Sequence, residues 1–519
     1  MSRAEYKKAQ EEWVTGHIGG SMSEINSVVG VILTSYMLWA ATTKYSNIFN
    51  KNGKIIILVL EFIILILPSI LACTLLSNHT FLLNLFLISI SIGLIYKSSS
   101  SSTNSSNSSV DKKKKRRKWD KDSDDDENLE ELLIKEKLDN EVDEKEIYSS
   151  TSKLNQKPFL SAYRSSMIIL TCIAILAVDF PVFPRRFAKV ETFGTSLMDL
   201  GVGSFVFSSG IVSARPFLKR PENRFRPFKG QLFQSVKQSL PILLLGFIRL
   251  IMVKGVDYQE HVTEYGKHWN FFFTLGLLPI FVTLCRAIQK YVRFSFVGIG
   301  IAILYQIVLS FYGLQDYIHD SPRTTNLISA NKEGIFSFWG YLTIFLFALD
   351  IGHYILPLDP YYTIRNGRQV KKPKPQKLIM ILFSWSILTW FGFLFSFGFQ
   401  IQISRQLANL SYIFWIIANN TSFLSLFQAV ELGFFSNYWK KKNVKEEDEK
   451  NVVPIIMDAI NFNGLGVFLL ANLLTGLVNL SIYTLYVNNI IAVGILVGYM
   501  FIISVIATLL WSKGLRFKL

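Results

Sequence analysis

The chain has 519 residues, of which 50% are hydrophobic, 42 are Phe and only 18% are charged. That charged fraction lies below the roughly 25% of a soluble globular domain, and long apolar runs recur along the whole chain, which excludes an ordinary water-soluble protein. The formal net charge is +16, but the basic residues lie between the apolar runs, which fits membrane topology and anionic lipid headgroups rather than nucleic acid.

The apolar runs predict an all-α polytopic integral membrane protein with about thirteen transmembrane helices. Each run is long enough to cross a bilayer as a helix and is continuously apolar, without the alternation of a barrel strand. The expected spans are residues 24–42, 55–77, 80–96, 162–179, 198–214, 238–253, 269–285, 294–312, 335–356, 378–400, 410–435, 464–486 and 489–511.

Lys and Arg collect in every second connection, and this sets the expected orientation. The basic connections are residues 43–54, 98–161, 215–237, 286–293, 357–377, 436–452 and those after 511. By the positive-inside rule they face the cytosol, so the N-terminus is expected in the lumen and the C-terminus in the cytosol. Residues 1–13 lack the features of a signal peptide, so the first span is expected to serve as the targeting signal.

Three regions are expected along the chain. Residues 1–97 hold the N-terminal tail and the first three spans, and residues 162–519 form the main bundle of about ten spans with the lumenal loops. Between them, residues 98–161 begin SSSSSTNSSNSS and carry seven consecutive cations at 112–118. Such a composition predicts a disordered cytosolic loop. The glycosylation sequons at Asn104 and Asn107 face the wrong compartment, and Asn78 lies too near the bilayer to be a clear acceptor.

The connection DFPVFPRRFAKVETFGTSLMDLG, residues 179–201, carries most of the chemistry. Asp179 closes an apolar helix, where partial desolvation raises the proton affinity of a carboxylate. Pro181 and Pro184 force a turn that can bring Lys189 back towards Asp179. A carboxylate beside an ammonium can take a proton from an alcohol while the cation stabilises an oxyanion. This pair is therefore the candidate catalytic pair.

A structural interpretation of the same charges stays open, because they could cap helix ends, pair with one another or anchor headgroups. On the functional interpretation, Arg185 and Arg186 bind a phosphate in a fork geometry. The other candidate substrate-binding residues belong to the expected lumenal side or to the span 464–486: Glu191, Asp199, His261, Glu264, His268, Asn331, Glu333 and Asn472.

Small residues at 201–210 favour close helix packing or a lipid groove over a dinucleotide site, since no strand precedes them. Gly201, Val202 and Phe205 are the candidate acyl-groove residues. Asn472 and Asn479 lie seven residues apart on nearly one helix face, as helix-bridging amides or as a polar lining for a headgroup.

No metal site is expected. His261 and His268 lack a ligand set of recognisable spacing, and a hydrogen-bonding role suits them better. Cys73, Cys172 and Cys285 lie in or beside apolar runs without CxxC spacing, so they indicate neither a disulfide framework nor a metal site. No GxSxG elbow or HxxxxD box occurs. His353 lies within a span, as a functional or an interfacial residue.

Several stretches together resemble one family, the inositol acyltransferases of glycosylphosphatidylinositol (GPI) anchor assembly in their fungal form. The matching stretches are WVTGHIGGSMSEIN (13–26), ILAVDFPVFPRRFAKVETFGTSLMDLGVGSFVFSSGIVS (175–213), VDYQEHVTEYGKHWNFF (256–272), ANKEGIFSFWGY (330–341), SRQLANLSYIFW (404–415) and NGLGVFLLANLLTGLVNLS (463–481). They span the chain in order, and the second is long and almost unbroken.

The resemblance implies a multi-pass enzyme of the endoplasmic reticulum. It would move a long acyl chain, commonly palmitoyl, from acyl-CoA to an inositol hydroxyl of glucosaminyl-phosphatidylinositol. It also implies that Asp179 and Lys189 take part in the reaction, that acyl-CoA is a co-substrate and that no cofactor is bound permanently. The expected partners are these two substrates, with no nucleic acid and no obligate protein partner.

Two other functions fit some of the features. A lipid transporter or flippase would need many spans and polar lumenal loops, although no matched interrupted helices are evident in the two halves. A histidine-dependent membrane acyltransferase would depend on His353.

The route of acyl-CoA to the site is open, because acyl-CoA is made in the cytosol whereas the candidate pair is expected on the lumenal side. The basic loop 215–237 could hold the CoA phosphates, or the thioester could reach into the bundle from below.

Overall fold

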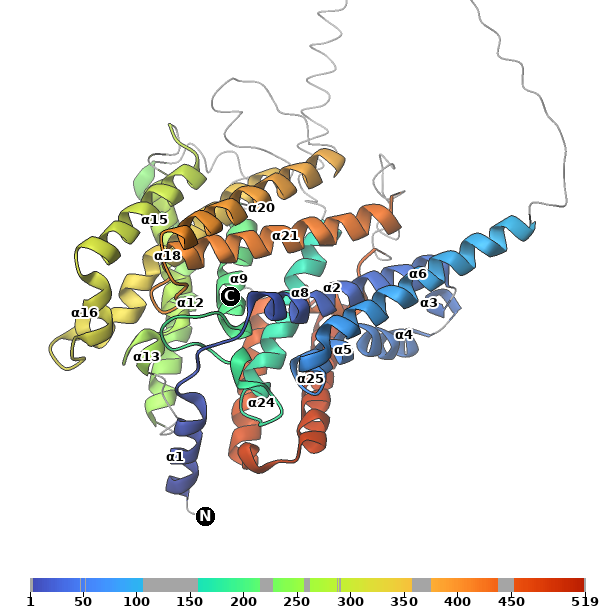
Figure 1. Ribbon diagram of the computed structural model, residues 1–519, viewed down its shortest axis with the longest axis horizontal. Helices are drawn as coiled ribbons and strands as arrows, with labels where there is room; N and C mark the ends of the chain where they lie inside the picture. The colour runs from blue at the N-terminus through green and yellow to red at the C-terminus, as the bar shows by residue number, and fades with distance from the viewer. Residues whose placement is uncertain are drawn as a thin grey trace, which may run out of the picture.

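A computed structural model describes residues 3–46, 48–51, 53–105, 157–214, 227–255, 262–286, 288, 291–356, 375–436 and 452–517 (Figure 1). Within these ranges the chain folds into helices joined by short connections and contains no strand. The first half comprises α1 (Arg3–Val14), α2 (Met22–Tyr45), α3 (Ile48–Lys51), α4 (Lys54–Glu61), α5 (Leu67–Cys73), α6 (Thr80–Ser105), α8 (Pro158–Ala177), α9 (Leu197–Ser213) and α12 (Phe228–Gly255).

The second half comprises α13 (Val262–Tyr265), α14 (Phe271–Cys285), α15 (Phe294–Phe311), α16 (Leu314–Asp320), α17 (Leu327–Ala330), α18 (Lys332–Ile355), α20 (Pro375–Gly398), α21 (Leu410–Phe434), α23 (Ile455–Phe462), α24 (Gly464–Ser481) and α25 (Asn489–Ser512). Short 3₁₀ turns cover Ser77–His79, Arg185–Phe187 and Thr484–Tyr486. A π-helical turn at Phe62–Ile66 joins α4 to α5 just before Pro68, where a proline removes a helical hydrogen bond.

The expected spans correspond one to one with helices of the structure. In the described ranges, 11 helices are long and apolar enough to cross a membrane. The remaining two expected spans, 198–214 and 269–285, correspond to the shorter apolar helices α9 and α14 of 17 and 15 residues. The chain is therefore an all-α polytopic membrane protein, while the number of complete crossings and the orientation stay predictions.

The expected loop 98–161 is helical at both edges, since α6 continues to Ser105 and α8 begins at Pro158. Residues 106–156, which include Asn107, lie outside the described ranges, whereas Asn104 belongs to α6. The proposed division at residues 97 and 161 stays a prediction.

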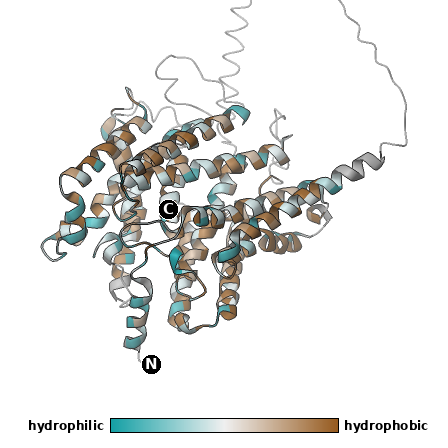
Figure 2. Ribbon diagram, in the orientation of Figure 1, coloured by the Kyte–Doolittle hydropathy of each residue, from teal (hydrophilic) through white to brown (hydrophobic). Residues whose placement is uncertain are grey.

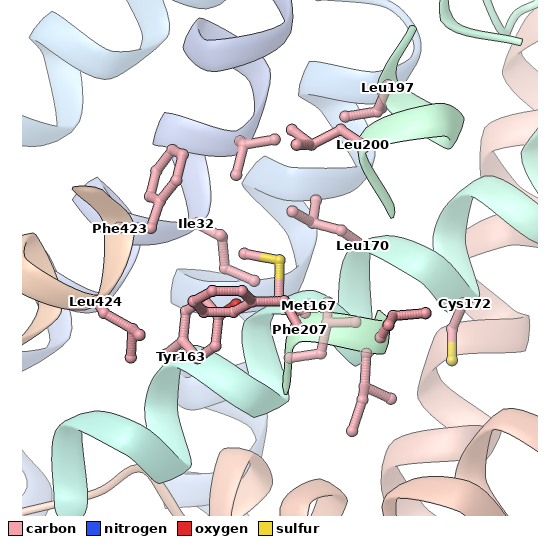
Figure 3. Close-up of a cluster of buried hydrophobic side chains, with 14 of the residues drawn as sticks. Ile32, Tyr163, Met167, Leu170, Cys172, Leu197, Leu200, Phe207, Phe423 and Leu424 are labelled. Carbon is pink, nitrogen blue, oxygen red and sulfur yellow. The ribbon is translucent and has the colours of Figure 1, made fainter. Parts of the chain in front are cut away.

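The centre of the bundle is α8, which packs between α2, α9 and α21. Ile32 of α2, Tyr163 of α8, Phe207 of α9 and Leu424 of α21 meet in one buried apolar cluster (Figure 3). Around this centre, helices such as α6 and α20 expose large apolar side chains; Phe81 and Phe391 are each 67% exposed. These outer helices are coloured as hydrophobic in Figure 2 and would face lipid in a membrane.

Two buried carboxylates cap helix starts inside the bundle. The side chain of Glu431 on α21 accepts a hydrogen bond of 2.6 Å from the backbone N–H of Phe159 at the start of α8. Glu61, at the end of α4, accepts hydrogen bonds of 3.0 and 2.9 Å from the N–H groups of Ile455 and Ile456 at the start of α23. Because the first N–H groups of a helix lack partners within it, these acids satisfy donors that lipid could not.

The connections expected on the lumenal side contact one another. Residues 15–21 meet the 178–196 connection through the bond from Gly20 N to Thr195 O, and Arg186 of that connection donates to Asn78 before α6. The 399–409 connection meets it as well, through the bond from Gly194 N to Ile403 O of 2.8 Å. These connections thus lie side by side, and their lumenal position stays a prediction.

Candidate active site

The turn after α8 is held by Arg185. Its guanidinium Nη2 donates hydrogen bonds of 2.9, 3.1 and 3.0 Å to the carbonyl oxygens of Val178, Phe180 and Phe183. The same group lies over the indole ring of Trp13, 4.4 Å from the ring centroid. Burial lowers the pKa of Arg185 to about 10, although the Asp179 carboxylate opposes this shift. Arg185 therefore closes the turn that the two prolines begin, rather than extending freely towards a phosphate.

Asp179 lies two residues beyond the end of α8, at the mouth of this turn. Its Oδ2 accepts a hydrogen bond of 2.7 Å from Nδ2 of Asn479 on α24. Burial raises the pKa of Asp179 from its ordinary value of 3.8 to about 6, against the lowering effects of the Asn479 hydrogen bond and the Arg185 charge. A carboxylate in this range is ionised near neutral pH and is a stronger base than an exposed aspartate.

Lys189 belongs to a different group of charges. Its Nζ forms an ion pair of 2.7 Å with Oε1 of Glu264 on α13. The same Glu264 oxygen lies 3.8 Å from Nη1 of Arg405, and Nε of Arg405 lies 2.7 Å from Oδ1 of Asp199 at the start of α9. Four charged side chains from three parts of the sequence thus form one continuous series of contacts: Lys189 and Asp199 from residues 179–201, Glu264 from α13 and Arg405 from the connection before α21.

The turn was expected to bring Lys189 back towards Asp179, but the structure pairs Lys189 with Glu264 and not with Asp179. Neither an ion pair nor a hydrogen bond joins these two described side chains: Asp179 pairs with Asn479, and Lys189 pairs with Glu264. The prolines do reverse the chain, but it is Arg185 that the turn brings back to Asp179, and the segment carrying Lys189 continues towards α13. Asp179 and Lys189 lie on the same loop, but the Asp179 carboxylate faces Asn479 and the Lys189 ammonium faces Glu264.

Arg405 was not among the candidate residues. It lies in the connection between α20 and α21, as a cation between two apolar spans and within the stretch 404–415 that resembles the family, and neither signal indicates its partners. Its side chain is 3% exposed. The carboxylates of Asp199 and Glu264 raise the pKa of Arg405 above its ordinary value even though burial lowers it. Asn479 was recognised only as a helix-bridging or lining amide, without its partner.

The other candidate residues that the structure describes make side-chain or backbone contacts within the protein. Arg186 pairs with Glu24 at 2.7 Å, and Glu333 pairs with Arg323 at 2.6 Å. Asn331 accepts hydrogen bonds from the backbone N–H groups of His268 and Trp269. Glu191 donates its backbone N–H to the carbonyl of His17, and His261 lies outside the described residues.

The three acyl-groove candidates share the half-buried side of α9. The ring of Phe205 makes edge and tilted contacts with Phe271 of α14 and Phe468 of α24, with ring centroids 5.6 and 5.4 Å apart. A methyl group added at Gly201 would meet only the Thr171 hydroxyl, 3.9 Å away. Asn472 donates to the carbonyl of Phe468 within its own helix. A half-buried apolar surface therefore begins just beyond Asp199, with space for a methyl group at Gly201.

His353 is enclosed near the end of α18. It is 2% exposed, lies 3.9 Å from an Asp350 oxygen and stacks on Phe294. In the described ranges no group of three or more His, Cys, Asp or Glu residues could hold a metal ion. The geometry around His353 is that of an internal ion-pair cluster, and it gives no support to a histidine-dependent reaction.

The many apolar helices and the charged cluster between their connections define a polytopic membrane protein with a polar site at one side of the bundle. The GWT1 family model matches residues 6–510, and the chain belongs to the GWT1 family. This membership confirms the resemblance to the inositol acyltransferases of GPI-anchor assembly.

Curated relatives named GPI-anchored wall transfer protein 1 match the chain along its length. The relative from Aspergillus fumigatus is 41% identical over 519 residues, that from Gibberella zeae 40% over 533, and that from Saccharomyces cerevisiae 37% over 548. Each match covers 99% of this chain and 99% of the relative. The similarity is therefore not confined to one segment.

Proposed function

We propose that this protein transfers a long acyl chain, palmitoyl in the first instance, from acyl-CoA to the inositol hydroxyl of glucosaminyl-phosphatidylinositol in the endoplasmic reticulum membrane. Membership of the GWT1 family over residues 6–510 is the observation that carries the proposal. The charged connection between α8 and α9 supplies groups suited to acyl transfer.

Asp179 is the proposed general base. Its pKa of about 6 leaves it ionised at neutral pH, and Asn479 holds one carboxylate oxygen while the other, Oδ1, is left for the substrate hydroxyl. The inositol oxygen gives its proton to Asp179 and attacks the thioester carbonyl carbon. General-base assistance of this kind contributes a factor of about 10²–10⁴ in rate.

Lys189 is the proposed oxyanion partner, because its side chain is 35% exposed, whereas those of Glu264, Arg405 and Asp199 are more deeply buried. The thioester carbonyl oxygen gains negative charge as the new C–O bond forms, and an ammonium at this position stabilises it. When the C–S bond breaks, the CoA thiolate leaves and takes the proton held by Asp179. The two residues thus act on different atoms and need not contact each other.

The acyl chain would lie along the half-buried side of α9, beside Gly201, Val202 and Phe205. The headgroup phosphate and glucosamine would meet the polar side chains of the same side of the bundle. Arg185 and Arg186 would act there by holding the loop in shape, since both guanidinium groups have protein partners. The expected lumenal position of this site and the passage of the thioester to it remain parts of the proposal.

The test uses membranes that contain the full chain in a background without this activity. Labelled palmitoyl-CoA and glucosaminyl-phosphatidylinositol are added, and the label is located on the lipid product by mass spectrometry. We expect inositol-linked label with the natural chain and a loss of about 10²-fold or more for Asp179→Asn and Lys189→Ala.

Asp458→Asn is the matched control, because Asp458 is also a half-buried aspartate that accepts a side-chain hydrogen bond, from Trp511 at 3.1 Å. It should leave turnover near the natural level. Absence of inositol-linked label with the natural chain would contradict the proposed reaction. Normal turnover in both site variants would contradict the assigned residues.

A further inference from the structure

The charged chain around Lys189 is graded in exposure. The side chains of Asp199, Arg405, Glu264 and Lys189 are 1%, 3%, 16% and 35% exposed, in the order in which they contact one another. Lys189, the last member, is thus the most exposed, and Arg405 and Asp199 at the other end are buried.

Asp199 holds the backbone beside Lys189 as well as the inner end of the chain. Its Oδ2 accepts a hydrogen bond of 3.1 Å from the N–H of Val190 and one of 2.7 Å from the Ser196 hydroxyl. Its other oxygen, Oδ1, is paired with Arg405. The Arg405–Asp199 pair thus fixes the peptide group that follows Lys189. Arg405 also acts on the Lys189 side chain, through the Glu264 carboxylate that lies near both cations.

The segment that carries Arg405 joins the two segments that carry Lys189 and Glu264. Ser404 donates a hydrogen bond of 2.6 Å to the carbonyl of Thr192, three residues after Lys189. Gln406 donates one of 3.0 Å to the carbonyl of Thr263, next to Glu264. Ser404 and Gln406, the two neighbours of Arg405, therefore hold the segments that carry Lys189 and Glu264.

Backbone strain is present at the same place. Ala408 has a φ of 46°, in the left-handed region that residues other than glycine seldom occupy. Such strain persists only where the surrounding contacts determine the conformation, and it gathers at functional segments. Here the buried Leu407 carbonyl accepts a hydrogen bond of 2.7 Å from Tyr305, which helps to hold the strained segment.

The charges of the chain also have an order. A lone Glu264 would give its full charge to Lys189, 2.7 Å away, and would weaken the ammonium as a partner for an oxyanion. Arg405 lies 3.8 Å from the same Glu264 oxygen, so this carboxylate serves two cations. Part of its charge is thereby taken up by a cation that no substrate can reach.

We propose that Arg405 is the positioning residue for Lys189: it fixes the Lys189 backbone through Asp199 and shares the Glu264 carboxylate, so that the ammonium stays available to a substrate oxyanion. The catalytic part of this inference rests on the proposed acyl transfer. The positional part concerns the ion pair itself and can be tested without turnover.

The first test measures the reactivity of Lys189 towards an amine-acylating reagent, in the full chain held in membranes, by mass spectrometry. The exposed Lys267 serves as the internal reference. Glu264→Gln removes the ion pair, so Lys189 should be labelled faster than in the natural chain. Arg405→Gln removes one of the cations that the Glu264 carboxylate serves, so more of its charge acts on Lys189, and Lys189 should be labelled more slowly.

Arg405→Lys guards against failure of Arg405→Gln to fold. The lysine keeps a buried cation beside Asp199, but a single ammonium lacks the fork that reaches two carboxylates. Slower labelling of Lys189 is expected here too. Labelling at the natural rate in either Arg405 variant would overturn the proposal, even if turnover fell.

The second test separates kcat from KM in the acyl-transfer assay. Misplacing a reacting group by about 1 Å costs about 10²-fold in rate, so Arg405→Gln should lower kcat by about 10- to 100-fold with little change in KM. The loss should not add to that of Glu264→Gln in the double variant, because both act on one ion pair. Additive losses would overturn the proposal.

Arg293→Gln is the control for the loss of an arginine that pairs with a buried aspartate. Arg293 is 21% exposed and forms an ion pair of 3.0 Å with Asp350, whose side chain is fully buried. This variant reports the loss of an arginine–aspartate pair elsewhere in the bundle. It should leave the relative labelling of Lys189 and Lys267 unchanged.

A protein that showed no acyl transfer at all would contradict the proposed function but not the labelling result.

Discussion

Asn479 donates a 2.7 Å hydrogen bond to Asp179 from a position 300 residues further along the chain. This contact joins the turn after α8 to the end of α24, so the proposed base is held by a helix that belongs to a different part of the sequence. The position of its carboxylate depends on tertiary packing as much as on the turn that carries it.

Asn479→Ala should impair the proposed base without removing it. Because the hydrogen bond lowers the pKa of Asp179 against burial, its loss should raise that pKa above about 6 and reduce turnover at neutral pH. The pH profile of kcat/KM measures this as a shift of the acidic limb towards higher pH. Ser481→Ala, on the same helix and exposed, is the control; an unmoved limb would show that Asn479 does not govern Asp179.

The natural chain should lose activity as the pH falls through about 6. Asp179 accepts a proton in the proposed reaction, and only its ionised form can do so, so the rate should fall tenfold per pH unit well below its pKa. The measurement is kcat/KM between pH 5 and pH 8. Residual activity of Asp179→Asn should lack this limb, and a limb retained in that variant would assign it to another group.

Asp179→Asn should stabilise the folded protein at neutral pH. The folded-state pKa of about 6 lies above the ordinary value of 3.8, so between these values the native state binds more protons than the unfolded state. Stability of the natural chain therefore falls as the pH rises through this window. The gain in Tm from the substitution should be larger at pH 7.5 than at pH 4.5, and an equal gain at both would contradict the buried-carboxylate account.

Gly340→Ala should destabilise the connection that carries Arg405. A methyl group at Gly340 of α18 would clash with the backbone oxygen of Ala408, and overpacking of this kind costs about 1–3 kcal/mol. Thermal unfolding in detergent and the acyl-transfer assay should both register the change. Gly494→Ala, on α25 with nothing within 4 Å, is the matched control and should be neutral or slightly stabilising.

Phe205→Trp should change the preference for acyl-chain length. The Phe205 ring already touches Phe271 and Phe468, so a larger ring would fill the space beside α9 that the proposed acyl chain uses. We expect shorter acyl-CoA donors to be favoured over palmitoyl-CoA, measured as ratios of kcat/KM across a donor series. An unchanged ratio would move the acyl chain away from this helix face.

The spans were predictable because their signal is local. Every expected apolar run corresponds to a helix, since in lipid a continuous apolar run satisfies its backbone only as a helix. The turn after α8 was predictable for the same reason, because Pro181 and Pro184 act on their own neighbours.

The partners of the site residues were not predictable in this way. Lys189 and Glu264 are 75 residues apart, and Arg405 is brought to them by hydrogen bonds from its two neighbours. Nothing in the spacing of one sequence states which of several cations and acids on one side of the bundle will pair. The prediction placed Lys189 near Asp179 because the two are close in sequence. In the structure each pairs with a residue far away in the sequence, Asp179 with Asn479 and Lys189 with Glu264.

The capping of α8 by Glu431 bears on the order in which the protein matures. Ribosomes deliver α8 long before α21, since the two capping partners are 272 residues apart. Until α21 is made, the N–H of Phe159 at the start of α8 lacks this carboxylate, so the start of this central helix gains its partner only late in synthesis. A truncated chain that lacks α21 would therefore leave this helix start without its cap. The order is the opposite for α23, because Glu61 of α4, which caps it, has already been made when α23 is synthesised.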